Sequence, residues 1–185
     1  MKKHLMLDLE TLDKGPRSAV ISIGACIFDA NGITDTFKVN IKPESAKAFG
    51  MTVGKDTLNW WAKQSEEARQ ASLTKNVMAD FGLQTFIDWV GKHRPDYIWA
   101  HGVVFDIVII EHAFSCVAKT QPWSYGSVMD SRTLFNLFGI KTKDLHSTAN
   151  TTHHDALDDA KTQANGVIAV LRSMGWGEDD SPLKI

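Results

Sequence analysis

The sequence predicts an α/β fold in which helices flank a mixed sheet of antiparallel and parallel strands. Three observations lead to this prediction. The first third of the 185-residue chain shows the alternation of strands, the remainder shows apolar residues at helical spacing, and a short strand-like run interrupts the helical part. Strands that come first and then alternate with helices indicate one layered α/β domain.

The first third is predicted to form an antiparallel meander. Residues 5–10 alternate, with leucines on one face and two acidic residues on the other, which is the period of a strand. A second strand is expected over 18–28 and a third over 36–41. Asn31-Gly32 between them is a strong signal for a tight hairpin turn.

Helical patterns dominate after the meander. Apolar residues spaced three and four apart predict helices over 77–90 and 156–174, and Gly175 ends the second of them. The run 97–100 is expected to form a short strand. The run 103–118 fits either element, because it is rich in β-branched residues and yet long enough for a helix.

Composition is that of an ordinary soluble globular protein, with 43% hydrophobic and 23% charged residues. The net charge of −2 argues against a protein that coats duplex DNA, because neutralisation of phosphates dominates such binding. Cys26 and Cys116 lie far apart, which favours a reducing compartment, and no stretch approaches the roughly 18 apolar residues of a membrane span. We expect a cytoplasmic domain over residues 1–176, with no membrane partner, and a loose tail over 177–185.

Three acidic residues stand where a carboxylate usually needs a partner. Asp8 and Glu10 share a strand face about 6.6 Å apart, so a cation between them would relieve repulsion. The solvated face of an edge strand is, however, the more common explanation of such a pair. Asp106 interrupts the apolar run 103–110, where an ionised carboxylate is costly unless it is paired. The first turn of a helix explains it as well as a metal ion does.

The segment that starts the last predicted helix offers several candidate ligands. His153 precedes His154, and Asp155 and Asp158 lie close to Asp159. The helix macrodipole favours acidic residues in a first turn without any function. Because both Asp158 and Asp159 fall outside the apolar stripe of the helix, spacing alone leaves the choice between them open.

Three short motifs stand in order along the chain: Asp8-Leu9-Glu10-Thr11, Phe105-Asp106 and His154-Asp155-Ala156-Leu157-Asp158-Asp159-Ala160. They resemble the DxET, FD and HxALxDA motifs of the DEDDh 3′–5′ exonucleases, the DnaQ-like group. This resemblance selects His154 and Asp159 over their neighbours. It also implies a ribonuclease H-like fold with a central mixed five-stranded sheet flanked by helices.

Two further segments resemble one branch of that family. Residues 57–69 are similar to the TxxWWxxQSxxAR segment of phage exonuclease A-type enzymes, and residues 130–134 are similar to their DxRTL segment. Ribonuclease AS-like exoribonucleases belong to the same branch. The family commonly has an asparagine four or five residues before the aspartate of its second motif, and His101-Gly102 stand there instead. His101 is expected either to replace that asparagine toward substrate or to be hydrogen-bonded at the end of a strand.

The resemblance implies a site for two ions of Mg²⁺ or Mn²⁺. Asp8, Glu10 and Asp159 would hold one ion, Asp8 would bridge to the second, and Asp106 would act on the second through water. His154 would serve as general base. The expected reaction releases nucleoside 5′-monophosphates from the 3′ ends of single-stranded DNA or RNA.

Five residues are expected to contact substrate: Thr11, His101, Phe105, Trp61 and Arg132. Trp60 and Trp61 point about 100° apart on a helix, so at most one of them is expected to face the site. The other belongs to the core. Arg132 is expected to contact phosphate or to pair with Asp130, and the pairing is slightly favoured.

Two other functions fit the same motifs. One is an oligoribonuclease-like enzyme restricted to very short RNA, and the other is a catalytically silent nucleic-acid-binding module. The second would lack a catalytic residue, and none is missing. No residue indicates selection for or against the 2′-hydroxyl that distinguishes RNA from DNA. Relatives that form homodimers make a homodimer the expected assembly.

Overall fold

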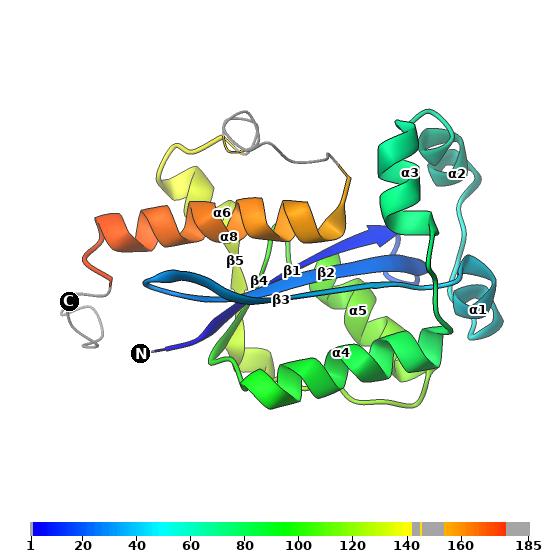
Figure 1. Cartoon of the computed structure of the whole chain (residues 1–185), viewed down its shortest axis with the longest axis horizontal. Coiled ribbons are helices and arrows are strands. Elements are labelled where there is room, and N and C mark those ends of the chain that lie inside the picture. Colours follow the sequence, from blue (N-terminus) through cyan, green and yellow to red (C-terminus); the bar gives the residue numbers. More distant parts are fainter. Residues whose placement is uncertain (1, 142–144, 146–153, 177–185) are drawn as a thin grey trace.

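In the computed structural model, which describes residues 2–141, 145 and 154–176, a five-stranded sheet lies between two layers of helices (Figure 1). The strands are β1 (His4–Thr11), β2 (Val20–Asp29), β3 (Gly32–Asn40), β4 (Tyr97–Ala100) and β5 (Val128–Asp130). Their order is β3-β2-β1-β4-β5, which places the first strand at the centre. β1 pairs antiparallel with β2 and parallel with β4. The predicted mixed sheet is therefore confirmed.

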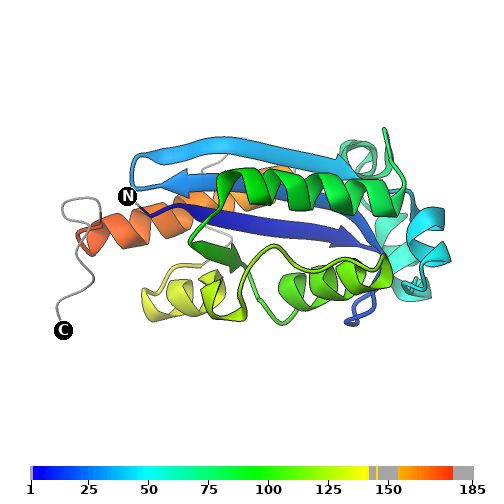
Figure 2. The same cartoon turned by 90° about the horizontal axis from the view of Figure 1, so that it is seen from below.

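Helices cover both faces of the sheet and one of its ends. They are α1 (Pro43–Ala48), α2 (Lys55–Trp61), α3 (Glu66–Leu73), α4 (Ala79–His93), α5 (Asp106–Cys116), α6 (Ser131–Leu137) and α8 (Ala156–Ser173). α6 and α8 lie on one face, and α4 and α5 lie on the other, as Figure 2 shows from below. α2 and α3 stand at the end of the sheet where β1 finishes (Figure 1). Within these described ranges, no helix combines the length and apolarity that crossing a bilayer requires.

The elements expected from the sequence form close to their expected bounds. The strand over 97–100 is β4, and the undecided run 103–118 contains α5. The second strand begins two residues later than predicted, because Ser18 makes an isolated bridge with Thr52 before the ladder to β1 starts. The third strand begins at Gly32 rather than at residue 36. The expected tail over 177–185 lies outside the described residues.

The alternation along β1 divides the core into two layers. Leu5, Leu7 and Leu9 are buried in the layer that faces α4 and α5. Met6 is buried on the opposite side, in the layer that includes Ala160 of α8. Asp8 and Glu10 continue the Met6 face of the strand, so both lie on the side covered by α8.

A glycine in β2 lets α8 approach the sheet closely. Gly24 pairs with Asp8 of β1 in the antiparallel ladder. A Cβ atom at Gly24 would lie 2.1 Å from the carbonyl carbon of Ala156, the first residue of α8. Only glycine leaves room for this contact. The start of α8 is thereby held against β2 beside the carboxylate of Asp8.

Candidate active site

The central strand supplies two carboxylates near its carboxyl end. Glu10 is buried and Asp8 is partly exposed, and both face α8. The strand continues past them only as far as Thr11. The apolar layer between β1 and α8 thus gives way to acidic side chains toward the end of β1. The helices α2 and α3 lie at this end of the sheet (Figure 1).

Asp106 brings a third carboxylate to this strand. It is the first residue of α5 and is only 4% exposed. Its Oδ1 atom accepts a hydrogen bond of 3.2 Å from the backbone N–H of Leu9, which lies between Asp8 and Glu10. The two explanations considered for Asp106 are therefore compatible, because this first-turn acid also points toward the paired acids of β1.

Two acidic residues near the start of α8 make capping and ion-pair contacts within the protein. Asp155 is the N-cap: its Oδ1 accepts from the backbone N–H groups of Leu157 and Asp158, at 3.0 and 3.5 Å, and its Oδ2 pairs with Lys38 of β3 at 2.7 Å. Asp158 pairs with Lys161 at 3.5 Å.

Asp159, in contrast, joins Glu10 and His154. One ligand atom from each of these three residues lies within 4.8 Å of those of the other two. The structure therefore brings together the histidine and the aspartate that the family motif selects. It also places the other acids of this segment in capping and ion-pair contacts.

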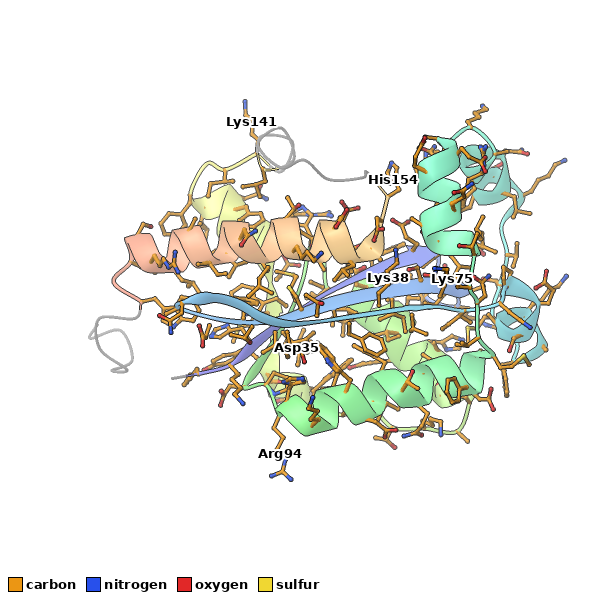
Figure 3. All side chains as sticks on the ribbon, in the orientation of Figure 1. Asp35, Lys38, Lys75, Arg94, Lys141 and His154 are labelled. Carbon is orange, nitrogen blue, oxygen red and sulfur yellow. The ribbon has the colours of Figure 1, made fainter. Side chains whose placement is uncertain are left out.

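The helices at the end of the sheet hold His154. Its backbone has a φ of 65°, in the left-handed region that residues other than glycine rarely adopt. The Trp60 ring lies edge-on to the imidazole, with 4.7 Å between ring centroids, and the Ser72 hydroxyl donates to the His154 carbonyl at 3.4 Å. Figure 3 shows His154 and Lys38 at the same end of α8, next to α3.

Burial raises the pKa values of three carboxyl groups of the site, and repulsion between these groups adds to the shift for Asp8 and Glu10. Burial, followed by the charges of Asp106, Glu10 and Asp159, raises the pKa of Asp8 well above its usual value. Burial and the charges of Asp159 and Asp106 raise the pKa of Glu10 to about 8. Burial raises the pKa of Asp106 to about 7, although the Leu9 N–H opposes the shift. A divalent cation would offset this repulsion, and a set of carboxylate oxygens suits Mg²⁺ or Mn²⁺.

These pKa values predict how the stability of the metal-free protein depends on pH. The pKa values of these carboxyl groups are higher in the folded protein than in the unfolded chain, where they are about 4. Their contribution to the stability of the fold is therefore present at low pH and is lost as pH rises through the pKa values of the folded state. The melting temperature in EDTA should therefore fall between about pH 5 and pH 8, the window set by Asp106 at about 7 and Glu10 at about 8. Calorimetric melts with and without Mg²⁺ test this, and Mg²⁺ should reduce the fall.

A matched variant isolates the contribution of the site from that of other titrating groups. Glu10→Gln removes one of the raised carboxyl groups, so its melting temperature in EDTA should fall less steeply over the same pH range. A slope identical to that of the unsubstituted protein would contradict a strongly raised pKa at Glu10.

The two tryptophans of α2 have the opposite arrangement to the one expected. Trp61, expected to contact substrate, is 3% exposed, and its indole N–H donates to the Thr11 carbonyl at 2.9 Å. The correction has a simple reason: Trp61 packs under the end of β1 and cannot offer a ring face to a base. Trp60 is 39% exposed and contacts His154. Thr11 is buried, and its hydroxyl donates to the Asp13 carbonyl at 2.7 Å.

The residues around the second motif make contacts within the protein. His101 Nδ1 lies 3.1 Å from the Ser131 hydroxyl, as expected for a histidine bonded at a strand end. The expected pairing of Arg132 with Asp130 is wrong. Asp130 instead caps α6, accepting from the N–H of Thr133 at 2.8 Å and also from a loop amide. Arg132 donates to the His101 carbonyl at 3.0 Å. Phe105 lies just before α5 and packs against the core.

Sequence reasoning missed one residue of the site. Gln163 of α8 is buried, and its Nε2 atom donates to Asp8 Oδ1 at 2.8 Å. The signal was present in the pattern, because a glutamine stands one helical turn after Asp159 between the apolar positions Ala160 and Ala164.

Comparisons with solved structures agree with the fold. The chain is similar to the nuclease domain of 3′hExo, a DEDDh family member bound to rAMP, with a TM-score of 0.68 at 14% identity, covering 93% of this chain and 92% of that one. It is similar to E. coli exonuclease I in complex with single-stranded DNA, also with a TM-score of 0.68 at 14% identity, over 95% of this chain and 41% of that one. The predicted ribonuclease H-like fold is thus confirmed.

Comparisons of sequence identify the family. The exodeoxyribonuclease of Enterobacteria phage T4 is 30% identical over 120 residues, which cover 57% of this chain and 52% of the relative. The chain thus spans about half the length of that relative. Residues 3–171 match the family described as the 3′–5′ exoribonuclease Rv2179c-like domain. Because the match extends over most of the sequence, the chain belongs to the Rv2179c-like family of 3′–5′ exoribonuclease domains.

Proposed function

We propose that this protein is a 3′–5′ exonuclease that hydrolyses single-stranded nucleic acid with the help of two divalent ions, Mg²⁺ or Mn²⁺. One observation carries the proposal. Glu10, His154 and Asp159 offer ligand atoms within 4.8 Å of one another, beside the carboxylates of Asp8 and Asp106. When bound, the ions would supply an activated water and would stabilise the charge that develops on the phosphoryl group.

Four carboxylates are proposed to bind the two ions. Asp8, Glu10 and Asp159 would hold one ion, and Asp8 would also contribute to the second. Asp106, whose Oδ1 accepts from the Leu9 N–H, would support the second ion through water. The raised pKa values of Asp8, Glu10 and Asp106 support this role, since the ionised forms need a cation beside them.

His154 takes the proton from the attacking water. An imidazole is suited to this step because its ordinary pKa lies near neutral pH. The contacts to Trp60 and Ser72 hold the ring and the backbone of His154 at the start of α8. The products are a nucleoside 5′-monophosphate and a strand shortened at its 3′ end.

The relatives are described as acting on nucleic acids with different sugars. The matching family is described as exoribonucleases, whereas the phage relative is named an exodeoxyribonuclease. Incubation with 5′-labelled RNA and DNA of several lengths separates these substrates. Stepwise shortening from the 3′ end is expected with Mg²⁺ and not with EDTA, and Glu10→Gln should be inactive on the same strands.

The same assay decides between the proposed enzyme and its alternatives. Cleavage restricted to dinucleotides would favour an oligoribonuclease-like enzyme. Binding of single strands without any cleavage would favour a silent nucleic-acid-binding module. Light scattering tests the homodimer, which rests on the family resemblance alone.

Trp60 is proposed to stack on a base of the substrate. Stacking of one base on an exposed aromatic ring contributes about 1–3 kcal/mol, so Trp60→Ala should raise KM about fivefold or more for a labelled single strand. Tyr125, which is 92% exposed on the short 3₁₀ helix Tyr125–Ser127, supplies the matched control, since Tyr125→Ala should leave KM unchanged. Equal KM values for both variants would contradict a stacking role for Trp60.

A further inference from the structure

Gln163 occupies a position where its helix is otherwise apolar. It lies on α8, one turn after Asp159, and is only 5% exposed. Its neighbours on the buried side, Ala160, Ala164 and Val167, are fully buried and apolar. A buried carboxamide costs free energy unless its polar atoms find partners, so packing alone would favour leucine or methionine here.

The two ends of the Gln163 carboxamide have different surroundings. The Nε2 atom donates to Asp8 Oδ1 at 2.8 Å. The Oε1 atom is buried, and no protein group in the described ranges donates to it. With a cation bound Asp8 would be ionised, and an ionised carboxylate only accepts hydrogen bonds and must face the amide nitrogen. The acceptor end of Gln163 is therefore left beside the acidic cluster.

The contact restrains Asp8 without changing the charge of the site. A side chain that accepts one hydrogen bond at a defined oxygen has less freedom to rotate, which holds the carboxylate in one orientation. A lysine at position 163 would compete with a cation for Asp8, and a glutamate would add to the repulsion that already raises the pKa of Asp8. Glutamine alone among these residues supplies the donor and remains neutral.

We propose that Gln163 is a positioning residue for Asp8, and this inference rests on the proposed two-ion function. Its Nε2–H fixes the Oδ1 oxygen of Asp8, so that the other oxygen would be free to bind the ions. Gln163 thereby links the orientation of the bridging carboxylate to a helix that also carries Asp159.

Gln163→Met tests the proposal, because methionine keeps the length and approximate volume of glutamine but cannot donate to Asp8. We expect Mn²⁺ affinity, measured by titration calorimetry on the full chain, to fall about 10- to 100-fold. The melting temperature in EDTA should be unchanged or higher, because a buried unsatisfied carbonyl has been removed. At saturating Mn²⁺, kcat for a labelled strand should be lower and KM unchanged.

Gln84→Met is the matched control. The Nε2 group of Gln84 on α4 donates to Asp88 Oδ1 at 2.7 Å. The substitution therefore removes the same kind of hydrogen bond, from an amide to a carboxylate, on the opposite face of the sheet. Mn²⁺ affinity and kcat should not change in this variant. Gln163→Asn, whose shorter side chain does not reach Asp8, should repeat the loss of affinity seen with Gln163→Met.

The outcomes separate this inference from the proposed function. Normal Mn²⁺ affinity in Gln163→Met would overturn the positioning role and leave the two-ion function standing. Unfolding of metal-free Gln163→Met and Gln163→Asn would also overturn it, since Gln163 would then be a structural residue. An unsubstituted protein that binds no Mn²⁺ and cleaves no strand would contradict the proposed function itself.

Discussion

Asp8→Asn is expected to abolish tight Mn²⁺ binding and to lower kcat at least about 10³-fold. Burial raises the pKa of Asp8, and the charges of Asp106, Glu10 and Asp159 raise it further, so its carboxylate interacts with all three of the other acids. A bound ion contributes several kcal/mol of transition-state stabilisation, and each 1.4 kcal/mol corresponds to about tenfold in rate. Titration calorimetry with Mn²⁺ and cleavage of a labelled strand measure the two effects.

The same substitution should stabilise the protein in EDTA, which distinguishes a metal-site acid from a structural one. An amide at position 8 removes one charge from a buried acidic cluster and can still accept from Gln163 Nε2. The melting temperature of metal-free Asp8→Asn should therefore rise at pH 8, whereas Mn²⁺ should no longer raise it. Asp80→Asn on α4 is the control, and normal Mn²⁺ binding by Asp8→Asn would rule out a bridging role.

His154→Ala is expected to lower kcat by about 10²- to 10⁴-fold, the contribution of a well-placed general base. Mn²⁺ affinity should stay within about threefold of that of the unsubstituted protein, because proton transfer and metal binding are separate tasks. Rates at saturating substrate and Mn²⁺, together with calorimetry, give the two quantities. His112→Ala on α5, where the imidazole contacts Cys116, should change neither.

Calorimetry also decides between two roles for this histidine. The imidazole lies close enough to Glu10 and Asp159 to share a cation with them. A large loss of Mn²⁺ affinity in His154→Ala would make His154 a ligand, and the assignment as general base would be abandoned. Full activity of the variant would exclude both roles.

Local sequence patterns predicted the parts of the fold and site that depend on local periodicity. The alternation along residues 5–10 placed Asp8 and Glu10 on one face, and the structure has them on the face covered by α8. The choice among the acids near His154 could not be made in this way. It depends on tertiary contacts, because Asp155 pairs with Lys38, 117 residues away, and Asp159 meets Glu10 of the central strand.

Other features escaped prediction because they are tertiary in origin. β5 has only three residues, too few to show alternation. The exposure of Trp60 and the burial of Trp61 follow from how α2 packs against the end of β1, which neither residue reveals by itself. Gln163 was overlooked because its partner, Asp8, lies 155 residues earlier in the chain.

The separation of the site residues along the chain has a consequence during protein synthesis. A nascent chain that has emerged only as far as α6 contains Asp8, Glu10 and Asp106 but lacks His154 and Asp159. Contacts between residues so far apart in sequence also form late, because long loops must close first. The proposed ion site is therefore incomplete until α8 has been synthesised and has docked on the central strand.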